Sequence, residues 1–110
     1  MTLDLTLYWQ SLAPVAARYK IFVHLVGESG PADLMAQADA YPHLPTNSWL
    51  PGEYVQDRLH LELPADLSPG SYRLLVGVYE EGPGARLPAY GADGRLLGDS
   101  LELESLAVGE

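Results

Sequence analysis

Apolar and polar side chains alternate along several stretches of this chain, and this two-residue period constrains the fold more than any other feature. Between Thr2 and Gln10, leucines and a tryptophan occupy every odd position from Leu3 to Trp9. Such alternation is typical of a half-buried β-strand. The same pattern, less regular, predicts further strands at Tyr19–Val26, Leu34–Asp39, Tyr54–Leu63, Tyr72–Tyr79, Arg86–Tyr90 and Leu101–Val108.

Clusters of glycine and proline separate these stretches, and no helical period is visible. About seven short strands joined by such turns predict an all-β fold, an antiparallel two-sheet sandwich of the immunoglobulin-like type. A chain of 110 residues has the usual size of one domain, so residues 1–110 are expected to form a single sandwich. Its predicted core consists of Leu5, Leu7, Val23, Leu25, Leu59, Leu61, Leu74 and Val76.

In the last predicted strand, the apolar residues change from one face of the strand to the other. The leucines at positions 101 and 103 share one face, whereas Leu106 and Val108 share the other. One extra residue in a strand produces such a change. We therefore expect a β-bulge near Glu104 or Ser105 that turns both pairs toward the core.

Charge and composition exclude several functional classes. Fifteen acidic residues against six basic ones give a net charge of −9, which opposes binding to a nucleic-acid backbone. The chain has no cysteine, so disulfides and thiolate metal sites are excluded. Its longest apolar run, Ile21–Val26, is far shorter than the ~20 residues of a membrane-spanning helix. Because the strand pattern begins at Thr2, no signal peptide is predicted, and any export signal is expected to lie elsewhere in a longer protein.

Four segments carry a family resemblance: residues 5–10 (LTLYWQ), 22–25 (FVHL), 45–53 (PTNSWLPGE) and 63–74 (LPADLSPGSYRL). Together they resemble a domain found at the C-terminus of bacterial multi-pass glycosyltransferase-like membrane proteins. The resemblance implies an extracytoplasmic β-sandwich that accompanies a membrane enzyme acting on lipid-linked sugars, while the function of the sandwich itself is uncharacterised. It also implies that one upstream strand is missing. Thr2–Gln10 would then lie at an open sheet edge, which favours weak homodimerisation.

No catalytic residue is predicted, and the chain is not expected to be an enzyme. His24, Ser48 and Asp57 are the residue types of a hydrolase triad, but the chain lacks the Gly-x-Ser-x-Gly elbow. We expect His24 and Asp57 instead to form a polar network with backbone N–H groups of residues 41–52, because a carboxylate on an apolar strand face needs donors. Tyr72 follows Pro69-Gly70 and is predicted to form a tyrosine corner, in which its hydroxyl bonds to the backbone a few residues upstream.

Neither a metal nor a cofactor is predicted. The three histidines, His24, His43 and His60, lack the close spacing of metal ligands. Asp93 and Asp99 flank a glycine-rich turn, which leaves calcium as an alternative. A hairpin turn at Asp93-Gly94 accounts for the same residues.

The sequence favours a non-catalytic accessory or interaction module, whose partner is a protein domain of the same or a neighbouring chain. The alternative is a carbohydrate-binding module, because the loop after Asp39 gathers Tyr41, His43, Asn47 and Trp49. Aromatic faces beside polar groups suit sugars. In the first case Trp49 folds inward and closes one end of the sandwich. In the second it forms an exposed platform for a glycan.

Overall fold

The computed structural model describes residues 1–108, and these residues are nearly all β. In β1 the odd-numbered side chains are half-buried and the even-numbered ones exposed, as the alternation predicts. The strands are β1 (Thr2–Gln10), β2 (Tyr19–Val26), β3 (Leu34–Ala40), β4 (Tyr54–Glu62), β5 (Gly70–Glu80), β6 (Ala89–Tyr90), β7 (Leu96–Gly98) and β8 (Leu101–Val108). A one-turn 3-10 helix, η1 (Thr46–Ser48), lies between β3 and β4.

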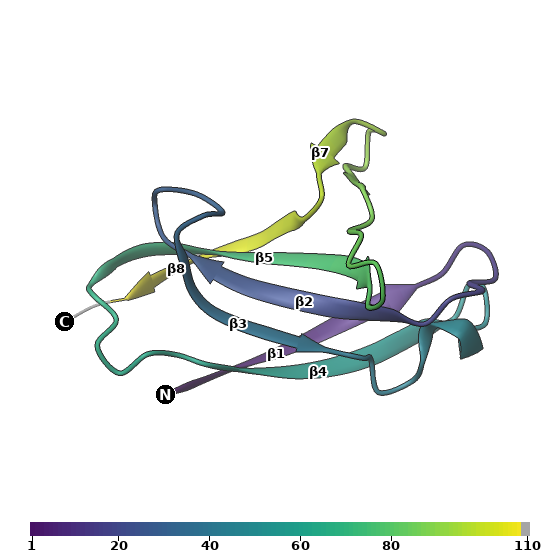
Figure 1. The fold of residues 1–110 in the computed structure, drawn as a ribbon, viewed down its shortest axis with the longest axis horizontal. Coiled ribbons are helices and arrows are strands. Elements are labelled where there is room, and N and C mark those ends of the chain that lie inside the picture. Colours follow the sequence, from purple (N-terminus) through teal and green to yellow (C-terminus); the bar gives the residue numbers. More distant parts are fainter. Residues whose placement is uncertain (109–110) are drawn as a thin grey trace.

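Two antiparallel sheets form a sandwich (Figure 1). One sheet has the strand order β3-β2-β5-β8, and the other consists of β1 and β4. One side of the sandwich is closed, because β3 and β4 contact each other. On the opposite side β1 and β8 end their sheets within residues 1–108. No helix in the described part of the chain has the length and hydropathy of a membrane span.

The core lies between the two sheets. The buried cluster contains Val23, Leu25, Leu59, Leu61, Leu74 and Val76, all of which the sequence predicts. Leu5 and Leu7 are also predicted core residues, but they pack against this cluster while remaining half-buried. The reason is their position in β1, which is the last strand of its sheet.

The segment between β5 and β8 differs from the predicted pattern. Only Ala89–Tyr90 form a strand within the predicted strand Arg86–Tyr90, and Arg86 itself makes an isolated bridge to Tyr79. The turn predicted at Asp93-Gly94 joins β6 to an additional strand, β7, before the chain reaches β8. A hairpin therefore replaces the single predicted strand.

The bulge predicted in β8 is present. The register between β5 and β8 shifts between Leu74 and Leu75, which leaves Leu103 as the extra residue, one position before Glu104. Positions 106 and 108 pack against the core, as predicted. The expectation for the other pair is wrong, since Leu101 and Leu103 are 37% and 40% exposed. They lie at the edge of the four-stranded sheet, where no further strand of residues 1–108 covers them.

Residues 81–100, which we call the arm, project from the outer face of the four-stranded sheet (Figure 1). At the base of the arm, Phe22 faces outward from β2 yet is only 2% exposed. The Arg86 guanidinium lies 4.4 Å from the centre of its ring. A Cβ at Gly77 would lie 2.1 Å from the same ring, so a glycine is required there.

Candidate functional site

The free edge of β1 is the first candidate surface. The Leu63 N–H donates to the Met1 carbonyl oxygen at 2.8 Å, which makes these two residues a hydrogen-bonded pair. Such pairs alternate along antiparallel strands, so the N–H and C=O groups of Asp4, Thr6 and Tyr8 point away from β4. Because β1 has no second strand neighbour among residues 1–108, these groups are available to another strand.

Side chains on the solvent face of β1 leave this edge accessible. Thr2 Oγ1 donates to Glu62 at 2.6 Å, and the Asp4 carboxylate lies 2.5 Å from His60 Nδ1. Both contacts run across to β4 and not along the free edge. Since β4 lies against β3, β1 lies on the side of β8, whose Leu101 is partly exposed.

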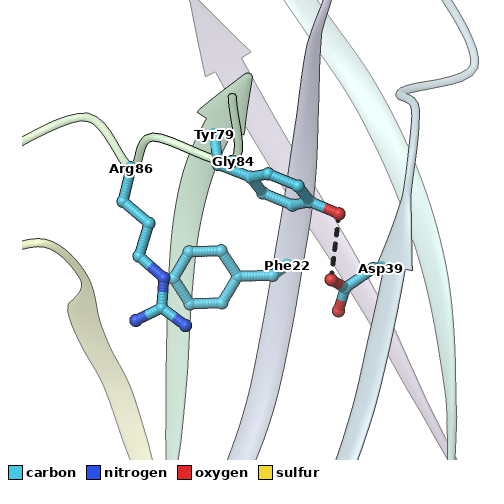
Figure 2. A pocket seen from close by; sticks show the side chains of 5 residues that line it. All are labelled: Phe22, Asp39, Tyr79, Gly84 and Arg86. Atoms are coloured by element: carbon cyan, nitrogen blue, oxygen red, sulfur yellow. Dashed lines mark hydrogen bonds between the residues drawn. The ribbon is translucent and has the colours of Figure 1, made fainter. Parts of the chain in front are cut away.

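A pocket of about 180 Å³ on the outer face of the four-stranded sheet is the second candidate (Figure 2). Tyr79 and Asp39 lie on one side of Phe22, and Arg86 lies on the other. The Tyr79 hydroxyl donates to Asp39 Oδ2 at 3.0 Å, and Arg86 Nη1 donates to Asp99 Oδ2 at 3.4 Å. Burial raises the pKa of Tyr79, and the bond to Asp39 adds to this effect. The pocket thus combines an acceptor, a neutral hydroxyl and a cation.

His24 belongs to this outer face and not to the network with Asp57. Its ring centre lies 4.7 Å from that of Phe22. Burial lowers the pKa of His24, although the nearby Asp39 opposes the shift, which favours the neutral imidazole. The expectation that His24 joins Asp57 in a network with the loop of residues 41–52 is wrong, because His24 occupies an outward position of β2, whereas Asp57 faces the core from β4.

Asp57 anchors the loop between β3 and β4, as expected. It is 3% exposed, and its Oδ1 accepts the His43 N–H at 3.4 Å. Its Oδ2 has no partner among residues 1–108. Burial raises the pKa of this carboxyl group, while the bond from His43 opposes the rise.

The Tyr72 hydroxyl donates to the Ser68 carbonyl oxygen, four residues upstream, at 2.5 Å. The predicted tyrosine corner is therefore present.

The four residues of the carbohydrate hypothesis do not form one site. Trp49 is 9% exposed, and its indole packs against Trp9 with ring centres 6.3 Å apart. Asn47 is exposed, and His43 borders a separate surface pocket with Gln56 and Arg58. Tyr41 faces the other way, with Arg18 and Lys20 lying 5.0 and 5.4 Å from its ring centre. Trp49 is therefore a buried plug at this end of the sandwich and not an exposed platform.

Three further polar residues have structural partners. Ser48 Oγ donates to the Pro45 carbonyl oxygen at 2.7 Å, at η1. Asp93 Oδ1 accepts the Arg95 N–H at 3.0 Å within the β6–β7 turn, and Asp99 binds Arg86. No group of three or more His, Asp or Glu side chains suited to a metal ion occurs among the residues that the structure describes.

Sequence reasoning missed the pocket in Figure 2. The one hint in the sequence was Phe22, a large apolar residue at an outward-facing position of β2, which pairs with Gly77 of β5. Compared with known proteins, the chain matches no family model, no curated protein and no solved structure.

Proposed function

We propose that this chain is a non-catalytic, immunoglobulin-like accessory module that binds a protein partner by accepting a partner strand at the free edge of β1. On this proposal, the module is attached to a membrane glycosyltransferase-like protein on its extracytoplasmic side. The segments at residues 5–10, 22–25, 45–53 and 63–74 support the attachment through their resemblance to such domains. Sequencing the gene on both sides of this segment tests it, since attachment requires several hydrophobic stretches of ~20 residues.

The unpaired edge of β1 is the observation that carries this proposal. Backbone groups on alternate residues give an added strand its hydrogen bonds, whatever its side chains. Half-buried leucines at Leu3, Leu5 and Leu7 border the same edge, so an added strand also gains apolar contacts. A hydrolytic or metal-dependent reaction has no comparable support in the described residues.

The net charge of the chain indicates which kind of partner strand is favoured. Two copies of a chain with a net charge of −9 repel each other, so pairing between copies is weak and strengthens with salt. A neutral or basic strand is the better partner. Screening at about 1 M salt reduces the Debye length to about 3 Å, compared with about 10 Å at 0.1 M.

Self-pairing provides a direct test. Sedimentation at high protein concentration should show dimer formation that increases with salt, together with slow amide exchange at Asp4, Thr6 and Tyr8. Thr6→Pro removes one outward N–H without removing a bond to β4 and should abolish dimerisation. Thr6→Val retains the N–H and serves as the matched control. Thr6→Glu, which adds repulsion at the edge, replaces Thr6→Pro if the latter fails to fold. A monomer under all conditions, with fast exchange at Asp4, Thr6 and Tyr8, would contradict the proposal.

Glycan binding is the second candidate, moved from the loop to the pocket in Figure 2. Asp39 accepts hydrogen bonds, Arg86 donates them, and Tyr79 offers a partly exposed ring. Sugar hydroxyls need such mixed partners. Chemical-shift changes on adding a panel of monosaccharides should occur at these residues and disappear in Asp39→Ala. Changes confined to other regions, or none at all, would rule out this site.

A further inference from the structure

A surface pocket of about 340 Å³ lies on the solvent face of the sheet formed by β1 and β4 (Figure 1). Gln56 and Arg58 line it from β4, and His43 lines it from the preceding loop. All three residues are exposed, so a molecule in solution can reach them. Sites for small molecules usually measure about 300 to 1,000 Å³, and this pocket therefore has room for one small ligand.

Two exposed tyrosines extend the pocket along the same face. Tyr8 lies directly opposite Gln56 across the two strands, and Tyr54 lies two residues before Gln56 on β4. Opposite side chains of an antiparallel pair have Cβ atoms about 4.5 to 5.5 Å apart, and alternate residues of one strand share a face. Tyr8 and Tyr54 are 67% and 72% exposed. Both rings are therefore accessible to a ligand that occupies the pocket.

Arg58 supplies a positive charge that no acidic side chain of the described residues neutralises in an ion pair. Three other cations of the chain do form ion pairs with acidic side chains: Lys20, Arg73 and Arg86. Asp4 lies on the same face as Arg58 but contacts His60. A guanidinium stays charged and presents its donors in a fork that matches a carboxylate. Arg58 is therefore available to a negatively charged ligand.

We propose that this face binds a sugar that carries one carboxylate, a uronic acid. The accessible rings of Tyr8 and Tyr54 suit the apolar face of a pyranose. Gln56 both donates and accepts hydrogen bonds, as sugar hydroxyls require. Arg58 favours a carboxylate, because one guanidinium balances one negative charge, whereas a doubly charged phosphate would meet more repulsion from a chain with a net charge of −9.

This site is separate from the edge of β1. Pairing with a strand uses backbone groups at that edge, whereas the uronic acid contacts side chains on the solvent face of the sheet. Binding of a uronic acid and pairing with a partner strand are therefore separate properties, and each has its own test.

Methyl β-glucuronide and methyl β-glucoside test this proposal, because the first has a carboxylate where the second has a hydroxymethyl group. In an assigned ¹H–¹⁵N spectrum, the glucuronide should shift the amide signals of Gln56 and Arg58 saturably. The glucoside should bind about tenfold more weakly, since it lacks the hydrogen bonds to the guanidinium. Acetate has the carboxylate but no ring and should also bind more weakly than the glucuronide.

Variants identify the residues responsible. Arg58→Gln should weaken glucuronide binding about tenfold and leave glucoside binding unchanged. Arg95→Gln removes the same charge from an exposed position of residues 81–100 and should change neither. Tyr8→Thr should weaken binding of both sugars several-fold, with Tyr90→Thr, at another exposed tyrosine, as the matched control. Because the replaced side chains are exposed, all four variants should fold.

Four results would overturn the proposal. The glucuronide may leave the signals of β4 unchanged, the glucoside or acetate may bind as tightly as the glucuronide, or Arg95→Gln may weaken binding as much as Arg58→Gln. Shifts confined to Asp39, Tyr79 and Arg86 would place sugar binding in the pocket of Figure 2 and not on β4.

Discussion

The loop between β3 and β4 (residues 41–53) and the arm (residues 81–100) are both rich in proline and glycine, but they behave in opposite ways. The loop folds back onto the sandwich and buries Trp49. The arm projects from it (Figure 1) and exposes Tyr90 and Leu96 by 57% and 59%. Composition alone therefore does not determine whether a connection becomes part of the core or an exposed surface.

The difference lies in hydrogen bonds to other segments. The loop is bonded to residues 10–19 through Thr46 and Gly52, and to β4 through the His43 N–H. The arm bonds to β5 at its base, where the Leu87 N–H donates to the Val78 carbonyl oxygen at 2.8 Å. The β6–β7 hairpin beyond this base has mainly internal bonds. Loop side chains should therefore contribute to stability, and outer arm side chains should not.

The largest expected effect is at Trp49. Trp49→Ala should lower the free energy of unfolding by about 3 to 5 kcal/mol, because it removes a buried ring and leaves a cavity. The matched variant in the arm, Leu96→Ala, should change stability by less than about 0.5 kcal/mol. Urea unfolding followed by circular dichroism measures both. Equal losses in the two variants would remove the distinction between loop and arm.

The hydroxyl of Thr46 should come next. Thr46→Val keeps the shape of the side chain but removes the bonds to Ala17 and Tyr19, so we expect a loss of about 1 to 3 kcal/mol. Asp93→Ala removes the corresponding side-chain bond within the arm and should cost only a few tenths of a kcal/mol, since this bond is exposed. A thermal melt of Thr46→Val that matches the parent would show that the loop is held by Trp49 alone.

Most of the sandwich could be predicted from the sequence, because apolar and polar residues alternate within each half-buried strand and this alternation is visible in the strand's own sequence. β1 and β4 show the pattern most clearly. The bulge at Leu103 was also detectable, since parity is a local property. The exposure of Leu101 could not be predicted in this way. It depends on whether another strand lies beside β8, and the residue pattern of one strand carries no information about its neighbours.

The candidate sites were harder to predict, because distant segments build them. The pocket in Figure 2 joins β2, β3, β5 and the arm, and no local motif links Phe22 to Arg86. The sequence left Trp49 between a plug and a platform, because three prolines stiffen a loop in either role. The hydrogen bonds of Thr46 to residues 17–19 decide between them, and such contacts have no signature in the loop itself.

Arg86 sharpens the contrast, because it lies at the base of the arm and its side chain packs on Phe22 of the sheet. Arg86→Ala should uncover Phe22 and remove the bond to Asp99, at a cost of about 1 kcal/mol, the usual size of a partly exposed cation–π contact. Leu96→Ala, at a side chain of the arm that is 59% exposed, is the control and should have no measurable effect. If Arg86→Ala is as stable as the parent, the contact between Arg86 and Phe22 does not contribute to the stability of the sandwich.

The smallest expected effect, and the one that depends on pH, comes from the carboxylate that anchors the loop. Burial raises the pKa of Asp57 above its ordinary value of 3.8, so the folded state binds the proton more tightly than the unfolded state does. The stability that this proton contributes is complete below 3.8 and is lost as pH rises through the raised pKa. Asp57→Asn keeps an oxygen for the His43 N–H but cannot ionise. Relative to this variant, the parent should therefore lose stability as pH rises from about 3 to about 7. Urea unfolding of the two proteins across this pH range measures the difference, and a constant gap between parent and Asp57→Asn would show that burial leaves the Asp57 carboxyl unperturbed.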